Sequence, residues 1–259
     1  MHSENLASLP ETFTEVCADH GEFTGSITTI CGRTFRTGCP SCAEIRKAKE
    51  AKAEIEAQAA KERERIQRKL GAALIPHRFI GKSFADYKAD TAAQKKALNT
   101  CQEYAQNFRA HFDAGRCLLL LGKPGTGKTH LAAAIANQIV TTTKATAIYR
   151  TVGGILQHIK GSYDRESGYS EREAFESYAQ TNLLIIDEVG ATKATEFELA
   201  TLFTIINSRY EQMMPTVIIS NLPPKALPDA LGERCVDRLR EGGGIALSFD
   251  WESVRGAIK

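Results

Sequence analysis

A glycine-rich segment at residues 122–129, with the sequence GKPGTGKT, has the composition of a loop that binds nucleotide phosphates. Gly125 and Gly127 let the backbone curl so that successive N–H groups point at phosphate oxygens, and the following helix start adds partial positive charge. Lys128 supplies a cation for the β- and γ-phosphates, and the Thr129 hydroxyl is placed to ligate Mg²⁺. The predicted phosphate-binding residues are Gly122, Lys123, Pro124, Gly125, Thr126, Gly127, Lys128, Thr129 and the adjoining His130.

Two adjacent carboxylates, Asp187 and Glu188, end an apolar run further along the chain. Because a strand buried on both faces does not carry acids inside it, we expect them at its exposed end, beside the phosphate loop. Asp187 is predicted to hold Mg²⁺ through water, and Glu188 to orient and deprotonate an attacking water. The pair therefore indicates hydrolysis rather than transfer to a substrate. Asn221, after another apolar run, either hydrogen-bonds that water or the γ-phosphate, or forms a turn before two prolines.

Cysteine and histidine residues near the N-terminus have the spacing of metal ligands. Cys17 and His20 form one pair and Cys39 and Cys42 a second, each with two residues between its members. Such a turn offers two ligands to one tetrahedral ion, so we predict a Cys3His zinc site, with Cys31 as the alternative to His20. Zinc binding worth roughly 10–16 kcal/mol supplies folding energy that so small a segment cannot obtain from a core. Three further cysteines, at 101, 117 and 235, are interpreted as ordinary core or surface residues.

The elements that must position these groups follow from the apolar pattern. In the C-terminal part short apolar runs alternate with helical segments, which is typical of a parallel sheet with helices on both faces. Ligands of such sheets bind at the carboxyl ends of the strands. We predict an α/β fold with a parallel five-stranded sheet, whose strands are 117–121, 145–151, 183–187, 216–221 and 245–249.

Residues 43–70 contain no Pro or Gly and are rich in strong helix formers, so they are predicted to form one long helix. Gly71 and Pro76 are expected to close it. The thin apolar stripe of this helix fits either a solvated spacer or a helix that docks a partner. The predicted organisation is a zinc-binding module at 1–42, a helical linker at 43–75 and a nucleotide-binding domain at 76–259.

The charge of the 259-residue chain is nearly balanced, with 33 Lys and Arg against 31 Asp and Glu. This argues against non-specific wrapping of nucleic acid, so any DNA binding must be local. No apolar run approaches the roughly 20 residues that span a bilayer, and the N-terminus has no signal pattern. We expect a cytoplasmic protein that does not engage a membrane.

The segment 79–259 resembles the DnaC/DnaI-type loaders of replicative helicases, which are AAA+ ATPases of the IstB-like superfamily. The matching stretches are 122–135, 184–190, 231–240 and 249–255. The resemblance implies an AAA+ fold, with ATP and Mg²⁺ as cofactors and ATP hydrolysis to ADP and phosphate. It also implies that Arg238 is an arginine finger reaching a neighbouring subunit's ATP site, with Arg234 as its support. Arg255 is implied to contact nucleotide within its own subunit, and a finger supplied in trans implies self-association through the ATP sites.

The same resemblance implies two partners, a DnaB-like hexameric helicase and single-stranded DNA. A DNA surface is implied around 151–178 and after Glu188, where Tyr163 and Phe197 have basic neighbours. Bases can stack on these aromatic rings at about 1–3 kcal/mol each. Those neighbours are Lys160, Arg165 and Lys193. Phe197 has a second interpretation, as a core residue of a helix. The clustered cysteines make the chain similar to zinc-bearing, often phage-borne loaders.

These observations favour an ATP-dependent helicase loader of DNA replication. One alternative is an IstB-like transposition helper ATPase, which differs in having a transposase as its partner. Another is a nucleotide-gated adaptor, in which ATP binding matters and hydrolysis is incidental.

Overall fold

The computed structural model describes residues 11–30 and 32–253. The chain divides into two compact units, Met1–Glu64 and Arg65–Lys259, and the boundary lies within helix α1 (Pro40–Ala72). The division into parts at 1–42, 43–75 and 76–259 stays a prediction.

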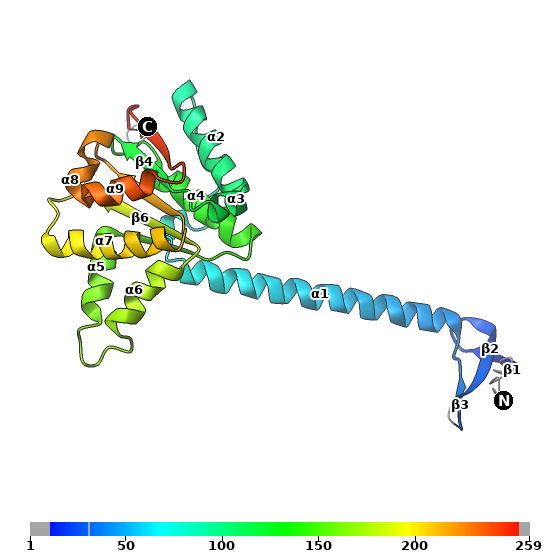
Figure 1. Ribbon diagram of the computed structural model, residues 1–259. Helices are drawn as coiled ribbons and strands as arrows, with labels where there is room; N and C mark the ends of the chain where they lie inside the picture. The colour runs from blue at the N-terminus through cyan, green and yellow to red at the C-terminus, as the bar shows by residue number, and fades with distance from the viewer. Residues whose placement is uncertain (1–10, 31, 254–259) are drawn as a thin grey trace, which may run out of the picture. The chain divides into compact units, whose positions relative to one another are not determined.

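The N-terminal unit contains an antiparallel sheet that the sequence analysis did not predict (Figure 1). Its strands are β1 (Glu11–Cys17), β2 (Gly21–Ile30) and β3 (Arg33–Arg36), paired in the order β1-β2-β3. Cys17 pairs with Gly21, so the turn between β1 and β2 lies at the first predicted ligand pair.

Helix α1 extends past Gly71 and ends at Ala72, so the expectation that Gly71 closes the helix was wrong. A single glycine inside a helix costs only about 1 kcal/mol relative to alanine, and packing of the last turn offsets this cost. Lys69 donates to the carbonyls of Val140 and Thr143 at 3.4 and 3.0 Å. These contacts hold the last turn of α1 against the nucleotide-binding unit.

The C-terminal unit is built on a five-stranded sheet in the order β5-β6-β7-β4-β8, and every pair of neighbours is parallel. This confirms the predicted α/β fold and its parallel sheet. The strands are β4 (Leu118–Gly122), β5 (Ala147–Thr151), β6 (Leu183–Val189), β7 (Thr216–Ser220) and β8 (Ile245–Phe249).

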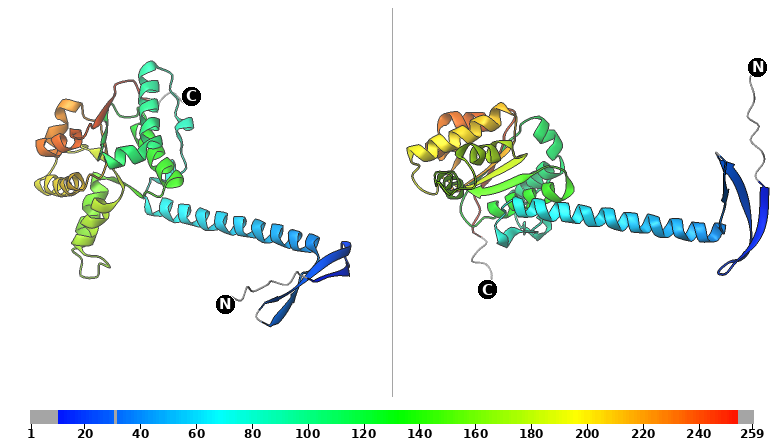
Figure 2. Two further views of the ribbon diagram at one scale, coloured as in Figure 1. Left: turned by 45° about the vertical axis from the view of Figure 1, so that its right-hand side comes forward. Right: turned by 90° about the horizontal axis from the view of Figure 1, so that it is seen from below.

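Helices cover both faces of this sheet (Figures 1 and 2). Leu118 and Leu120 belong to one apolar cluster and Leu119 and Leu121 to the other, because successive side chains of a strand point to opposite faces. The first cluster includes α2 (Ala92–Gln106), α3 (Phe108–Asp113) and α4 (Lys128–Thr142). The second includes α5 (Val152–Gly161), α6 (Glu171–Gln180), α7 (Glu196–Glu211), α8 (Leu227–Leu231) and α9 (Glu233–Arg240).

Cys101, Cys117 and Cys235 are buried in these clusters, as expected of ordinary core residues. Short 3-10 turns complete the unit, at η1 (His77–Phe79), η2 (Phe84–Asp86) and η3 (Pro224–Ala226). Within the described part of the chain, no helix combines the length and the apolar character that crossing a membrane requires.

Candidate functional site

The glycine-rich segment forms the loop between the end of β4 and the start of α4. Gly127 caps the helix with a φ of 93°, and Gly125 has a φ of 76°, a region that favours glycine. A Cβ on Gly127 would lie 2.5 Å from a ring carbon of Tyr87, so this position also has no room for a side chain. The loop is therefore a tight turn whose backbone approaches its neighbours closely, a geometry suited to binding phosphate.

Lys128 is buried at the first position of α4, with its ammonium inside the curl of this loop. Its Nζ donates to the carbonyls of Gly122 and Lys123 at 2.6 Å each. These contacts place a cation at the centre of the loop, where it is suited to offset the charge of phosphate oxygens.

Asp187, near the end of β6, is oriented by three groups. Thr129 Oγ1 donates to its Oδ2 at 3.1 Å, and the hydroxyl of Tyr149 on β5 donates to the same oxygen. The backbone N–H of Glu188 donates to Oδ1 at 2.6 Å. Burial, followed by the charge of Asp187, raises the pKa of Tyr149, so its hydroxyl remains a donor at neutral pH. A hydroxyl and a carboxylate at this separation are oxygen ligands of the kind that Mg²⁺ prefers.

Glu188 has a backbone conformation that is rare for a residue with a side chain, with a φ of 62°. The register between β6 and β7 shifts between Ile186 and Val189, which marks an irregularity in the strand at this residue. Such a conformation costs about 1–3 kcal/mol. Its result is that Asp187 is buried while Glu188, next in sequence, is exposed.

A cavity of about 650 Å³ joins these groups, which is large enough for a nucleotide. Glu188 and Asn221 line it together with the loop and Asp187. The segment before α2 also lines it, including Phe79 and Tyr87. Every residue of the predicted phosphate loop lines this cavity except Gly122 and Lys123, whose carbonyls accept hydrogen bonds from Lys128. Arg255 lies outside the described residues.

Three aromatic residues of this site were missed by sequence reasoning: Tyr87, Tyr149 and Trp251. Tyr149 lies on β5, which was predicted as a strand. Its contact with Asp187 depends on β5 pairing with β6, and the sequence did not reveal the order of the strands. Tyr87 and Trp251 donate to the Thr126 carbonyl at 3.1 and 3.2 Å. Nothing in the spacing of either residue links it to the loop.

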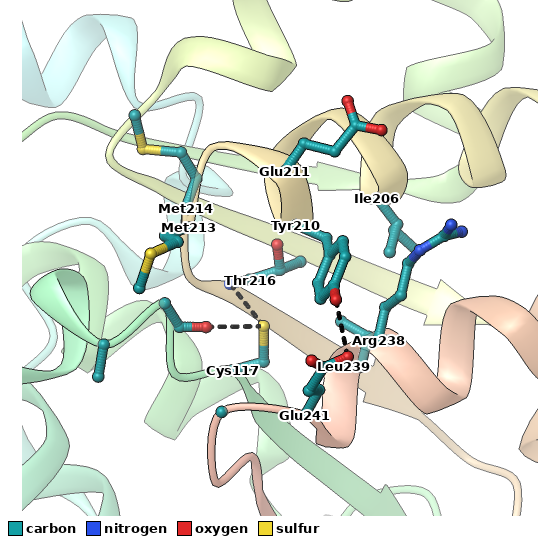
Figure 3. A pocket seen from close by; sticks show the side chains of 13 residues that line it. Cys117, Ile206, Tyr210, Glu211, Met213, Met214, Thr216, Arg238, Leu239 and Glu241 are labelled. Carbon is teal, nitrogen blue, oxygen red and sulfur yellow. Dashed lines mark hydrogen bonds between the residues drawn. The ribbon is translucent and has the colours of Figure 1, made fainter.

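Arg238 does not line the nucleotide cavity of its own chain. It lines a separate cavity of about 360 Å³, together with Cys117 and Thr216 at the amino ends of β4 and β7 (Figure 3). Its guanidinium carbon lies 5.0 and 5.4 Å from the ring centroids of Phe203 and Tyr210, a cation–π geometry. Arg234 is exposed. The assignment of Arg238 as an arginine finger, with Arg234 as its support, stays a prediction.

The aromatic residues assigned to DNA differ in exposure. Tyr163 is 55% exposed, and its hydroxyl donates to Glu171 at 2.8 Å. Phe197 is partly buried and packs against the second apolar cluster, with Lys160 Nζ 5.3 Å from its ring centroid. Phe197 thus has the environment of a helix residue at the edge of the core, and the DNA surface stays a prediction.

The four predicted zinc ligands come together in the N-terminal unit, with their ligand atoms within 4.8 Å of one another. Cys17 Sγ lies 3.4 Å from Cys42 Sγ and 3.6 Å from His20 Nδ1, and Cys39 Sγ lies 3.8 Å from His20 Nδ1. A tetrahedral zinc with ordinary bond lengths has ligand separations of about 3.6–3.8 Å, so the cluster fits this ion. Cys31, the alternative ligand, lies outside the described residues.

The thiols of this cluster differ in pKa. A backbone hydrogen bond at Asp19 and the His20 side chain lower the pKa of Cys17 to about 6, whereas hydrogen bonding to Cys17 raises that of Cys42 to about 12. With this pKa the Cys17 side chain is a thiolate at neutral pH, which is the form of cysteine that binds metal.

The parallel sheet, the glycine-rich loop between β4 and α4, and the Asp187–Glu188 pair define a P-loop nucleotide-binding protein. Residues 52–238 match the family described as IstB-like ATP binding protein. The chain is 32% identical over 195 residues to the replicative helicase loader DnaC of Buchnera aphidicola subsp. Acyrthosiphon pisum, covering 75% of this chain and 78% of that protein. It is also 32% identical to DnaC of Escherichia coli K12 over 176 residues, covering 68% and 70% of the two chains.

Solved structures show the same fold. The DnaC helicase loader crystal structure superposes with a TM-score of 0.61 at 22% identity, covering 68% of this chain and all of that one. DnaI superposes with a TM-score of 0.56 at 19% identity, covering 70% and 94%. The chain belongs to the IstB-like ATP-binding family and, within it, to the group of the DnaC-type helicase loaders.

Proposed function

We propose that this chain is an ATP-hydrolysing loader of a replicative helicase, in which the bound nucleotide acts as a switch. The observation that supports hydrolysis is the arrangement at the end of β6. Asp187 is held by Thr129, while Glu188 is exposed beside it on the same cavity. A carboxylate at this place is suited to orient a water molecule and accept its proton as the water attacks the γ-phosphate.

The other residues of the cavity take complementary roles. The Lys128 ammonium and the loop amides bind the phosphates, and Thr129 and Asp187 hold Mg²⁺ directly or through water. Mg²⁺ supplies charge neutralisation at the phosphate oxygens. The amide of Asn221 hydrogen-bonds the attacking water or the γ-phosphate.

Arg238 acts on a neighbouring copy of the chain, since it lies away from its own nucleotide cavity. This role requires self-association through the ATP sites. Arg255 is the candidate for an arginine that contacts the nucleotide within the same copy.

The partners are a DnaB-like hexameric helicase and single-stranded DNA, and this proposal rests on the relatives, which are named replicative helicase loaders. The N-terminal unit, with Zn²⁺ held by Cys17, His20, Cys39 and Cys42, contacts the helicase. The nucleotide-binding unit contacts DNA.

The test of this function is a pull-down from host lysate with the tagged chain in ATP or in ADP, probed for the replicative helicase. We expect capture that differs between the two nucleotides. Lys128→Ala should abolish that difference, because phosphate binding is lost, and Glu188→Gln should hold the complex in its ATP form. Capture that is identical in ATP, in ADP and with Lys128→Ala would refute the switch.

A second experiment addresses Arg238. Arg238→Ala should leave ATP affinity intact while hydrolysis falls by about 10³-fold or more, the effect of an arginine finger in related phosphoryl-transfer enzymes. Loss of affinity and hydrolysis by the same factor would place this arginine in a structural role on Phe203 and Tyr210.

The IstB-like description of the matching family supports a second candidate, a transposition helper ATPase. Capture of a transposase in place of the helicase would favour it. If Glu188→Gln leaves both capture and release of the helicase unchanged, hydrolysis is incidental and the chain is a nucleotide-gated adaptor.

A further inference from the structure

The backbone carbonyl of Thr126, in the middle of the phosphate loop, accepts two side-chain hydrogen bonds. The Tyr87 hydroxyl donates to it at 3.1 Å, and the indole Nε1–H of Trp251 donates to it at 3.2 Å. A carbonyl oxygen has two lone pairs, so the two donors use its full accepting capacity. They come from segments on either side of the unit's core in sequence, one before α2 and one after β8.

Each donor is itself held in place. Tyr87 follows the η2 turn, where both the backbone N–H and the hydroxyl of Ser83 donate to Asp86 at 2.8 Å. Its ring contacts His130 edge-on, with centroids 5.7 Å apart, and packs on Gly127. Burial raises the pKa of Tyr87 to about 12, so the hydroxyl carries its proton at neutral pH.

Trp251 lies two residues after the end of β8, whose last residue, Phe249, pairs with Gly122. The N–H of Lys123 donates to the carbonyl of Phe249 at 2.9 Å, so the chain leaves β8 beside the start of the loop. The rings of Phe249 and Trp251 have centroids 4.8 Å apart. Two residues further on, Ser253 reaches Gly125, where a Cβ would meet its hydroxyl at 2.0 Å.

We infer that Tyr87 and Trp251 are positioning residues for the phosphate loop, acting through the Thr126–Gly127 peptide. In a planar trans peptide the C=O and N–H bonds point in opposite directions. Fixing the Thr126 carbonyl from outside therefore fixes the direction of the Gly127 N–H, one of the amides at the N-terminus of α4. Hydrogen bonds to a carbonyl also polarise its peptide and strengthen the N–H as a donor.

The inference rests on the proposed nucleotide site, and it predicts a loss of affinity without a change of fold. Tyr87→Phe removes the hydroxyl and keeps the ring on Gly127, and Trp251→Phe removes the indole N–H. Each should weaken ATP binding roughly threefold to tenfold, the effect of one lost hydrogen bond. Because the two donors share one acceptor, the double variant should depart from the product of the single effects.

The experiment is a titration of each full-length variant with a fluorescent ATP analogue, alongside a thermal melt without nucleotide. Tyr104→Phe is the matched control, since the Tyr104 hydroxyl also donates to a backbone carbonyl, that of Arg116, at 2.7 Å at the other end of β4. It should lower the melting temperature and leave ATP affinity unchanged. Trp251 is the single tryptophan of the chain, so its emission should also change when ATP is added to the wild type.

The outcomes separate this inference from the site on which it rests. If Lys128→Ala loses ATP binding while Tyr87→Phe and Trp251→Phe bind like the wild type, the positioning role is refuted and the site stands. If Tyr104→Phe weakens binding as much as they do, the effect is one of general stability and the role is again refuted. If Lys128→Ala binds ATP like the wild type, the site and the role fail together.

Discussion

The two units of the chain differ in what is buried in them. In the nucleotide-binding unit the central strands are closed to solvent on both faces, and residues such as Ile185 and Val217 have no exposed surface. In the described part of the N-terminal unit, residues 11–30 and 32–64, only Gly25 and Cys39 are buried. Several of its apolar side chains are exposed, Val16 to 74% and Ile30 to 58%, while Phe13, Phe23 and Ile27 are half-buried.

The two units therefore offset the entropy cost of folding in different ways. Ordering a residue costs roughly 1–2 kcal/mol for the backbone alone. Apolar burial offsets that cost in the nucleotide-binding unit. The N-terminal sheet has no comparable core, since its packed Phe13 and Phe23 rings are only half-buried, and Cys17, His20, Cys39 and Cys42 form the one cluster of possible metal ligands among the described residues. We therefore expect one unit to depend on its core and the other on its metal.

The largest effect should come from removing zinc. A chelator added to the full-length protein should unfold the N-terminal unit, because metal binding contributes about 10–16 kcal/mol in sites of this type. Limited proteolysis should then cut within residues 11–42 while the unit beginning at Arg65 stays intact and binds ATP. Simultaneous loss of both units would contradict the comparison.

The ligand set can be tested in the same protein by measuring zinc content. His20→Ala should lose the metal and Cys31→Ser should keep it. The reverse result would replace His20 by Cys31 as the fourth ligand.

A smaller effect is expected from a substitution that creates a cavity in the core of the nucleotide-binding unit. Val217→Ala, on β7, removes apolar groups worth roughly 1.5 kcal/mol and leaves a space that adds to the loss, for a total of about 2–3 kcal/mol. Thermal unfolding should shift by about 2–4 °C per kcal/mol in a unit of this size. Zinc content should not change. An unaltered melting temperature would show that burial at Val217 contributes less than its closed environment implies.

Much of the nucleotide-binding unit was predictable because its strands are buried on both faces. Continuous apolar runs such as Leu183 to Ile186 have few other interpretations, and the glycine-rich loop fixed which strand came before a helix. The three exposed strands of the N-terminal unit carry no such signal. Their sequences are rich in threonine, and their one apolar face, with Phe13, Phe23 and Ile27, forms only when β1 pairs with β2, so only the ligand spacing in this unit was informative.

The residues of the candidate site also differ in whether the sequence could predict them. Residues that contact phosphate or metal were predictable, since Lys128, Thr129 and Asp187 are dictated by the chemistry and lie in contiguous motifs. Tyr149 and Trp251 were not, because each reaches the site through strand order and the path of the chain after a strand. Distances in space between remote segments are set by packing, and no local pattern records them.

The smallest expected effect is the counterpart of the core substitution. Val16→Ala makes the same chemical change on β1, where the side chain is 74% exposed and the strand lies at the edge of its sheet. Little apolar area leaves water there on folding, and edge positions show weak strand propensity, so the loss should be about 0.5 kcal/mol or less. Resistance of residues 11–42 to proteolysis across a zinc titration should therefore match the wild type. A clear loss of resistance would mean that Val16 contributes to folding despite its exposure, and the N-terminal unit would then not depend on its metal alone.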